Sequence, residues 1–374
     1  MEKFAFMIHP LDAKRDTSRK WPWVRHIPRP VVEWGISKLK PWAVSHITGL
    51  RSITGAEAEG WFIVCPLVPN QFFSLPIKTV YDRITQCGRI AADLGAKIIG
   101  LGALTSVVGD GGITIASRLG IAVTTGNSYT VAVAIDETLS MARRLQIGLP
   151  AEVAIVGATG SIGSTCAEIL ASQSSVLTLV GRNVPNLESL AARLRPMAAG
   201  SVVVSTEVAS GIRNADLVIT VTSAVDTVVD PSDIKPGAVV CDVARPRDVS
   251  RRVREQRDDV LVIEGGMVQP PGEVDFGFDF GYPPGLCLAC MAETMILALD
   301  GRYESFTLGK KVDVEQVRTI TGLASKHGFR VANPRSFEQP VTDDQIDAVR
   351  ENARKHRSAR SCPEPASSAQ AATA

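Results

Sequence analysis

The chain has 374 residues, of which 45% are hydrophobic and 21% charged, and its formal net charge is +1 at pH 7. These proportions are typical of a globular protein with room for two domains, and so small a net charge argues against a nucleic-acid partner held by overall electrostatics. The N-terminal apolar stretch is too short for a signal peptide, and no apolar run is long enough to span a bilayer, so a cytoplasmic protein is predicted. An odd number of cysteines, seven, does not indicate a disulfide framework, and we expect free thiols.

The first distinctive segment, residues 11–47, is basic and rich in tryptophan. Trp21, Trp23, Trp34 and Trp42 are interleaved with lysines and arginines. Several prolines favour an irregular, solvated arm that packs its tryptophans on the core. The alternative is a docking surface for an acidic carrier protein or anionic lipid, which would give the protein a peripheral membrane contact through residues 11–47.

Strands and helices alternate between residues 61 and 149. Apolar runs predict strands at 61–65, 96–102 and 120–126, and amphipathic patterns predict helices at about 80–94 and 128–145. Two of the strands lead into polar, glycine-containing loops that carry Ser106 and Asn127. Loops at the carboxyl ends of strands are where α/β folds bind ligands, so residues 1–149 are expected to form an N-terminal α/β substrate lobe.

Residues 150–280 repeat strand and helix with greater regularity. Continuous apolar strands of this kind are typical of a parallel sheet covered on both faces, here a doubly wound Rossmann domain. A C-terminal helical segment, 281–357, and a disordered tail, 358–374, are expected to follow. The predicted fold class is therefore α/β with two lobes: the N-terminal substrate lobe and an NADP-binding Rossmann domain, joined by the C-terminal helical segment.

A glycine-rich turn follows the first strand of this domain, in the sequence "VAIVGATGSIGS". Glycines allow a sharp turn, close approach of the backbone to a pyrophosphate, and tight packing of a helix whose N-terminus faces the anion. The strand before the turn and the helix after it both favour dinucleotide binding. The predicted cofactor-binding residues of the turn are Gly157, Ala158, Thr159, Gly160, Ser161, Ile162 and Gly163.

The next strand ends in "LVGRN", so Arg182 and Asn183 stand where an NAD-binding protein usually carries an acidic residue. An acid would repel a 2′-phosphate, whereas an arginine can pair with it, and the predicted cofactor is NADPH. Arg182 as a solvated surface side chain is the alternative. Thr222 and Ser223, at the end of the fourth strand, are expected on the nicotinamide side of the cleft.

Cys287 and Cys290 stand three residues apart at the head of an apolar helical run. Zinc is not expected, since no second cysteine pair lies nearby and the histidines are dispersed. The preceding prolines and glycine do not provide the context of a redox Cys-x-x-Cys centre, which leaves packing or a nucleophile. A thiol at a helix start is expected to ionise more readily, and beside a nicotinamide it could hold an acyl group as a thioester for reduction to an aldehyde.

With these residues in view, the chain resembles the long-chain acyl-(acyl carrier protein) reductases of cyanobacteria and their bacterial relatives described as predicted amino-acid or shikimate-type dehydrogenases. The similarity covers roughly residues 47–330, and it rests on several stretches in the family's order: "ITGLRSITGAEAEGWFIVCPL", "LGALTSVV", "TTGNSYT", "VGATGSIGS", "GRN", "EGGMV", "LACMAETMIL" and "SKHGF".

The resemblance implies that NADPH reduces a fatty acyl thioester, carried by acyl carrier protein or coenzyme A, to a fatty aldehyde through a covalent acyl-cysteine. Its nucleophile falls on Cys290 within "LACMAE", and its polar substrate loops fall on Ser106 and Asn127. The cyanobacterial enzymes carry a histidine where this chain has Tyr129, and they lack the tryptophan-rich segment before residue 47.

Two other functions are compatible with the sequence. The first is a non-covalent NADP-dependent dehydrogenase of an amino, hydroxy or shikimate-type acid, although the lysine and aspartate pair of shikimate-type enzymes is not recognisable here. The second is a non-catalytic Rossmann protein that senses NADPH and signals through the basic segment.

Overall fold

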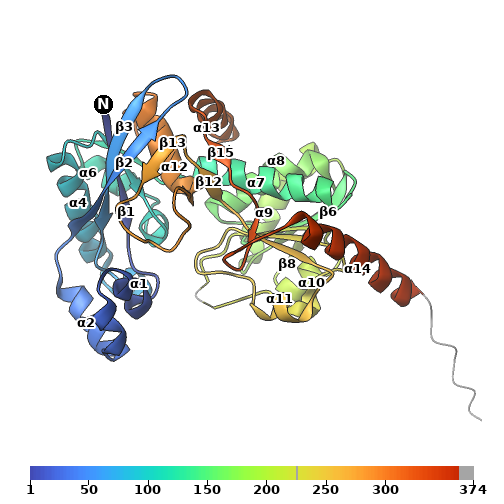
Figure 1. The fold of residues 1–374 in the computed structure, drawn as a ribbon. Helices are drawn as coiled ribbons and strands as arrows, with labels where there is room; N and C mark the ends of the chain where they lie inside the picture. The colour runs from blue at the N-terminus through green and yellow to red at the C-terminus, as the bar shows by residue number, and fades with distance from the viewer. Residues whose placement is uncertain (225, 362–374) are drawn as a thin grey trace, which may run out of the picture.

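The computed structural model describes residues 1–224 and 226–361, which form two α/β lobes built on separate six-stranded sheets (Figure 1). The predicted fold class is confirmed. Among the described residues, no helix has the length and apolar character needed to cross a membrane.

The N-terminal sheet has the strand order β13-β2-β3-β1-β4-β5. Strand β1 lies at its centre and pairs in parallel with β3 and β4, while β2 and β13 extend the sheet antiparallel. Strand β1 was not predicted from the sequence, and residues 272–275 were expected in the other lobe. The strands are β1 (Glu2–Ile8), β2 (Trp42–Arg51), β3 (Glu57–Val64), β4 (Ile98–Leu101), β5 (Ala122–Thr124) and β13 (Gly272–Asp275).

Helices cover both faces of this sheet. The buried face of α4 (Ile77–Asp93) packs against β1, β3 and β4, and α12 (Ala289–Leu299), from the cysteine segment, packs against the opposite face. Three short helices complete the lobe around α4: α3 (Pro69–Ser74), α5 (Leu104–Val107) and α6 (Ile113–Arg118).

The basic, tryptophan-rich segment is helical up to residue 38, and its last residues, 42–47, begin β2. It forms α1 (Ala13–Lys20), the 3-10 helix η1 (Pro22–His26) and α2 (Arg29–Lys38), at the lower left of Figure 1. The expected irregular arm is therefore wrong. The expected packing of the tryptophans on the core is wrong for Trp23 and Trp34, which are 62% and 66% exposed, whereas Trp42 is half-buried in β2.

The second sheet has the order β11-β10-β9-β6-β7-β8, with every neighbouring pair parallel, which is the doubly wound arrangement. Its strands are β6 (Ala151–Val156), β7 (Ser174–Val180), β8 (Ser201–Ser205), β9 (Leu217–Thr220), β10 (Val239–Asp242) and β11 (Leu261–Glu264). Its helices are α8 (Ser161–Leu170), η2 (Ala171–Gln173), α9 (Val184–Leu194), η3 (Arg195–Met197), α10 (Val208–Ile212), η4 (Pro231–Asp233) and α11 (Arg252–Gln256).

Helix α7 (Asn127–Arg144) connects the lobes, because Val133 joins the core of the first sheet and Val131 that of the second. The C-terminal part adds α13 (Val314–His327), α14 (Asp343–Ser361) and short strands: β12 (Met267–Gln269), β14 (Cys287–Leu288), β15 (Arg330–Val331), β16 (Arg335–Ser336) and β17 (Gln339–Pro340). Because α14 continues to Ser361, it overlaps the start of the expected disordered tail, whose remainder, 362–374, lies outside the described residues.

Candidate functional site

A large cavity of about 1290 Å³ lies between the two lobes. Its walls come from the turn between β6 and α8, the end of β9, the starts of α7 and α12, and the inner side of α1 and α2. Most of the predicted site residues line it: Ser106, Asn127, Gly157, Thr159, Gly160, Ser161, Ile162, Arg182, Thr222, Ser223 and Cys290. Three do not line it: Ala158, Gly163 and Asn183.

The turn between β6 and α8 requires two of its glycines. Gly157 has φ +85°, a conformation that side chains rarely adopt, and a Cβ on Gly163 would lie 2.3 Å from the Gly157 carbonyl oxygen. The glycines thus bring the N-terminus of α8 against the end of β6 and leave backbone open to the cavity. Ala158 is fully buried beneath the turn. This is a cradle suited to a pyrophosphate.

Arg182 lies at one end of this cradle, after β7, where its exposed side chain borders the cavity. Asn183 has a different task, since its side chain accepts a hydrogen bond of 2.9 Å from the backbone N–H of Asn186 and caps α9. Arg182 is a cation, and the residue after it, which caps α9, is an asparagine and not an acid. This arrangement is compatible with a phosphate on the adenosine ribose.

At the other end, Thr222 is held by Asp248, which sequence reasoning missed. The backbone N–H of Thr222 donates to Asp248 Oδ2 at 2.9 Å, and its hydroxyl donates to Oδ1. Burial raises the pKa of Asp248 to about 6, although the Thr222 bonds act in the opposite direction. The exposed Ser223 beside them borders the cavity without such a restraint.

Cys290 is the second residue of α12, in the wall that faces the glycine turn. The start of α7 lies directly against it: a Cβ on Gly126, the N-cap of α7, would lie 2.3 Å from Cys290 Cα. Two helix N-termini therefore converge on the thiol, and their partial positive charges favour negative charge there. The close approach explains the glycine in "TTGNSYT".

The pKa of the Cys290 thiol is raised, whereas a lowered pKa was expected from its position at a helix start. Burial, followed by the charge of Glu293, raises the pKa of Cys290 to about 12, and the N–H of Met291 and the cation of Arg245 offset this only in part. The thiol of the free protein is therefore protonated at neutral pH. Cys287 is fully buried in β14 and burial raises its pKa as well, which agrees with a packing role.

Glu293, one helical turn after Cys290, fixes this wall and was also missed. Its fully buried carboxylate accepts hydrogen bonds from Thr124 Oγ1 at 2.5 Å, Thr307 Oγ1 at 2.8 Å and the Tyr129 backbone N–H at 2.8 Å. Burial raises its pKa despite these donors. Glu293 thus ties α12 to β5, to the first turn of α7 and to the 307 loop. The position of Glu293 in the "CMAE" motif could have indicated its importance from the sequence alone.

The two residues expected to bind substrate have internal partners. Asn127 Nδ2 donates to Ser161 Oγ at 2.9 Å, which connects α7 to the glycine turn, and Ser106 Oγ donates to the Ala103 carbonyl at 2.6 Å. Both side chains are largely buried but border the cavity. A substrate oxygen would have to replace the Ala103 carbonyl to accept the Ser106 proton, whereas Asn127 Nδ2 carries a second N–H besides the one it donates to Ser161.

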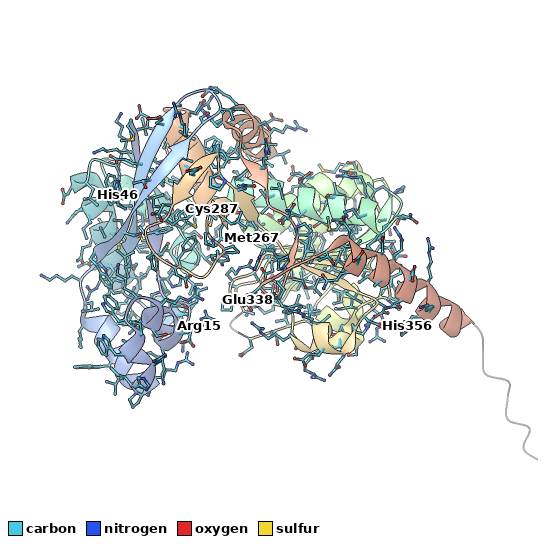
Figure 2. The ribbon with its side chains drawn as sticks, in the orientation of Figure 1. Arg15, His46, Met267, Cys287, Glu338 and His356 are labelled. Atoms are coloured by element: carbon cyan, nitrogen blue, oxygen red, sulfur yellow. The ribbon has the colours of Figure 1, made fainter. Side chains whose placement is uncertain are left out.

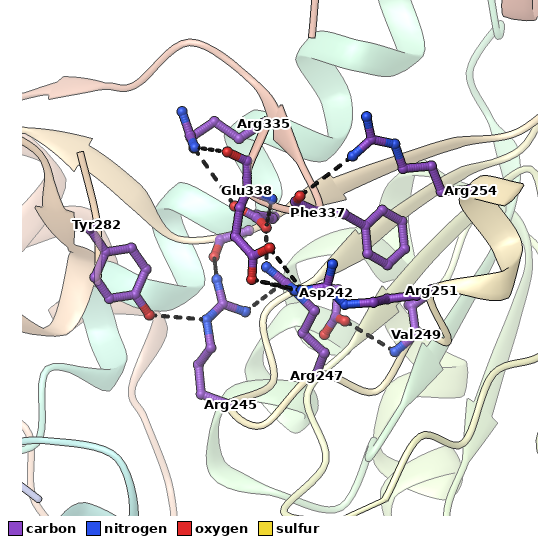
Figure 3. A network of polar contacts seen from close by, with 12 residues as sticks. Asp242, Arg245, Arg247, Val249, Arg251, Arg254, Tyr282, Arg335, Phe337 and Glu338 are labelled. Atoms are coloured by element: carbon purple, nitrogen blue, oxygen red, sulfur yellow. Dashed lines mark hydrogen bonds and ion pairs between the residues drawn. The ribbon is translucent and has the colours of Figure 1, made fainter. Parts of the chain in front are cut away.

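A partly buried arginine, Arg245, stands on the Rossmann side of the cavity (Figure 3). It donates to the carbonyls of Asp242 and Ala244 and, at 3.4 Å, to the hydroxyl of Tyr282. Burial alone would lower its pKa, but Tyr282 and Asp242 raise it, so the guanidinium stays charged. It is a fixed positive charge that acts on Cys290.

A neighbouring cluster joins the end of β11 to the β16–β17 hairpin: Arg247 pairs with Glu264 and Glu338, and Arg251 with Glu338 (Figure 3). Glu338 lies across the cavity from Arg15 of α1 (Figure 2), and its charge contributes to the raised pKa of Arg15. The cavity mouth is thus lined by charged groups from both lobes.

Comparison with known proteins identifies three similarities. Residues 142–264 match the family described as shikimate / quinate 5-dehydrogenase. The chain is 27% identical over 337 residues to the long-chain acyl-[acyl-carrier-protein] reductase of Synechococcus elongatus, covering 86% of this chain and 95% of that protein. It is 32% identical over 304 residues to the aminotransferase PigE of a Serratia species, covering 79% of this chain but only 35% of PigE.

The resemblance inferred from the motifs is confirmed. Both the acyl-carrier-protein reductase and the shikimate-type dehydrogenases are recovered, and with the glycine turn they support an NAD(P)-dependent oxidoreductase in general. The chain spans about a third of PigE. Among solved structures, the L-tryptophan dehydrogenase of Nostoc punctiforme aligns with 95% of this chain and 89% of its own, at 13% identity and a TM-score of 0.40.

Proposed function

We propose that the protein reduces a long-chain acyl thioester to an aldehyde with NADPH, through an acyl group bound to Cys290. The observation that carries the proposal is the position of this thiol. Of the described cysteines, Cys290 is the only one that is not fully buried, and it shares one cavity with the glycine turn.

The cradle of the Rossmann lobe would hold the cofactor. The backbone of residues 157–162 would bind the pyrophosphate, Arg182 the 2′-phosphate, and the loop fixed by Thr222 would line the nicotinamide side. When bound, NADPH supplies the hydride. The similarity to the acyl-carrier-protein reductase supports NADPH as the cofactor.

The chain's own part begins with the thiol. Cys290 Sγ attacks the thioester carbonyl carbon, its new S–C bond replaces the bond to coenzyme A or the carrier, and the thiol proton leaves on the departing sulfur. Negative charge on the carbonyl oxygen in this step would be stabilised by the N-termini of α7 and α12. The fixed cation of Arg245 favours the thiolate in the same step.

An acyl chain would lie in the apolar half of the cavity. Away from Arg182, the apolar part of the wall consists of Trp21, Ile36, Leu39, Trp42, Val44, Phe278 and Phe280. The side chains that α1 contributes beside them are polar or charged. Phe62 packs against a group of phenylalanines from the 276–282 loop, with ring centroids 5.1 to 5.9 Å apart. Burial of a long alkyl chain here would contribute on the order of 0.8 kcal/mol per methylene.

The test is a reductase assay with a long-chain acyl-coenzyme A and an acyl-carrier-protein thioester, following NADPH oxidation and aldehyde. Native protein and Cys287→Ala should form aldehyde with either or both donors, whereas Cys290→Ala should form none. Equal activity of Cys290→Ala and native protein would refute the covalent step.

A non-covalent NADP-dependent dehydrogenase is the second candidate. It is favoured by the shikimate / quinate 5-dehydrogenase match of residues 142–264 and by the raised pKa of the Cys290 thiol. Oxidation of a hydroxy or amino acid with NADP⁺, insensitive to alkylation of Cys290, would establish this candidate instead.

A further inference from the structure

The helical segment of residues 13–40 contains α1, η1 and α2. Its inner face is apolar and packs on the lobe, and its outer face is exposed. Ala13, Val24, Val32 and Ile36 form a small buried core with Val68 of the main lobe. This core fixes the segment to the protein, so its outer face is a defined surface.

Large apolar side chains are exposed on that outer face. Trp23 is 62%, Trp34 66% and Val31 53% exposed. All exposed tryptophans among the described residues belong to this segment. Tryptophan favours the headgroup level of a bilayer, because its ring is apolar and its N–H is polar.

The segment is more basic than the rest of the chain. Residues 11–40 contain eight lysines and arginines and three acidic residues, against a net charge of +1 for the whole chain. Each acid is already paired within the segment: Asp12 with Arg29, Asp16 with Arg15, and Glu33 with Arg29.

The surplus positive charge therefore stands among the exposed tryptophans. Lys38 and Lys40 follow Trp34 at the end of α2, and Arg25 follows Trp23. Lys38 and Lys40 have no ion pair among residues 1–224 and 226–361. Lysine and arginine beside interfacial tryptophan are the combination that binds anionic lipid headgroups.

The outer face also meets the cavity. Trp21 and Leu39 line the cavity and are at the same time 37% and 44% exposed, and the Trp21 ring lies 6.3 Å from that of Trp42, another lining residue. In Figure 1, α2 forms the lower left extremity of the molecule. The apolar end of the cavity therefore opens at the same protruding tip that carries the tryptophans and the unpaired cations.

We propose that this tip binds an anionic phospholipid membrane, with Trp23 and Trp34 at the headgroup level, so that the apolar end of the cavity faces the bilayer. A planar bilayer fits a protruding tip better than a partner that requires a groove. The chemistry recognised is a surface of negative headgroups over an apolar interior, and binding does not depend on the reaction at Cys290.

The experiment measures sedimentation of the full chain with vesicles of phosphatidylcholine, with and without about a third phosphatidylglycerol. The anionic vesicles should bind at least about tenfold more tightly, and added salt should weaken binding. Trp23→Ala combined with Trp34→Ala should lower the affinity about tenfold, and so should Lys38→Glu combined with Lys40→Glu. Thermal unfolding verifies that the variants fold.

Ile53→Ala is the matched control, because Ile53 is 73% exposed in the turn between β2 and β3, and Figure 1 shows that turn at the opposite end of the lobe from α2. It should bind like native protein. Equal binding to neutral and anionic vesicles, no binding, or native binding by the tryptophan variant would overturn the proposal. An acidic carrier protein that binds the tip while vesicles do not would also overturn it. Aldehyde formation from soluble coenzyme A thioesters should be unaffected in every variant, which separates this test from that of the proposed function.

Discussion

The two ends of the central cavity are built by different means. At the cofactor end, the glycine turn exposes backbone to the cavity and Arg182 reaches it from the surface. At the thiol end, the groups that define the site are charged or ionisable: Glu293 is fully buried, and Cys290 and Arg245 are partly buried. Backbone held by glycine tolerates changes of neighbouring side chains, whereas each buried ionisable group depends on its partners.

This difference indicates that binding and chemistry should fail separately. Changes at the thiol end should remove the reaction and leave cofactor binding, and changes at the cofactor end should weaken binding and leave the reaction. Four predictions test this separation.

The largest effect is expected from the pair of cysteines. Cys290→Ala should lower aldehyde formation by about a thousandfold or more, because no other thiol borders the cavity among the described residues. Cys287→Ala should keep activity within a few fold, since Cys287 only packs in the core. Both should bind NADPH like native protein by fluorescence titration, and loss of binding in Cys290→Ala would contradict the separation.

The raised pKa of Cys290 predicts a steep pH dependence of its reactivity. Because the pKa of about 12 lies above the pH throughout, the thiolate fraction should rise about tenfold per pH unit between about pH 7 and about pH 9. Alkylation of the cofactor-free protein by iodoacetamide, located by peptide mass, should follow this slope. A rate independent of pH in this range would show that the thiol is already ionised.

Gly126→Ala should displace Cys290 and lower activity, although the substitution leaves the thiol itself unchanged. The new Cβ would lie 2.3 Å from Cys290 Cα, at a backbone φ of +75°. Displacement of Cys290 should lower aldehyde formation by tens of fold and stability by about 2 kcal/mol. Gly120→Ala, with nothing within 4 Å of its Cβ, is the control and should resemble native protein in activity and thermal unfolding.

The smallest effect is expected at the cofactor end. Arg182→Ala should raise the KM for NADPH about tenfold, leave kcat unchanged and hardly affect the KM for NADH, since an exposed arginine contributes a solvent-screened contact with the 2′-phosphate. Arg213→Ala, an exposed arginine that does not line the cavity, is the control. A parallel rise for NADPH and NADH would place Arg182 outside the phosphate site.

The sequence predicted the Rossmann lobe well because continuous apolar strands and a glycine turn are local signals. It failed at α1 and α2, where prolines suggested irregular chain. Pro22 and Pro30 occupy the first turns of η1 and α2, where a missing N–H is tolerated. Strand β1, which becomes the centre of a sheet only through β3 and β4, has no local signal of that position.

The pairing of distant elements explains what was missed at the site. The position of Cys290 at a helix start was visible in the sequence, but Glu293, the contact with Gly126 and the degree of burial depend on tertiary packing. Burial outweighs the helix start and reverses the expected direction of the thiol pKa. Asp248 and Arg245 likewise gain their roles from partners across the fold.

The most direct test of the central claim is the mass of the intact protein after incubation with a long-chain acyl-coenzyme A and no NADPH. The account predicts that native protein and Cys287→Ala gain the mass of one acyl group, that Cys290→Ala gains none, and that added NADPH removes the group as aldehyde. Absence of an adduct with both coenzyme A and carrier-protein thioesters, in protein that binds NADPH, would contradict the acyl-cysteine and favour the non-covalent dehydrogenase.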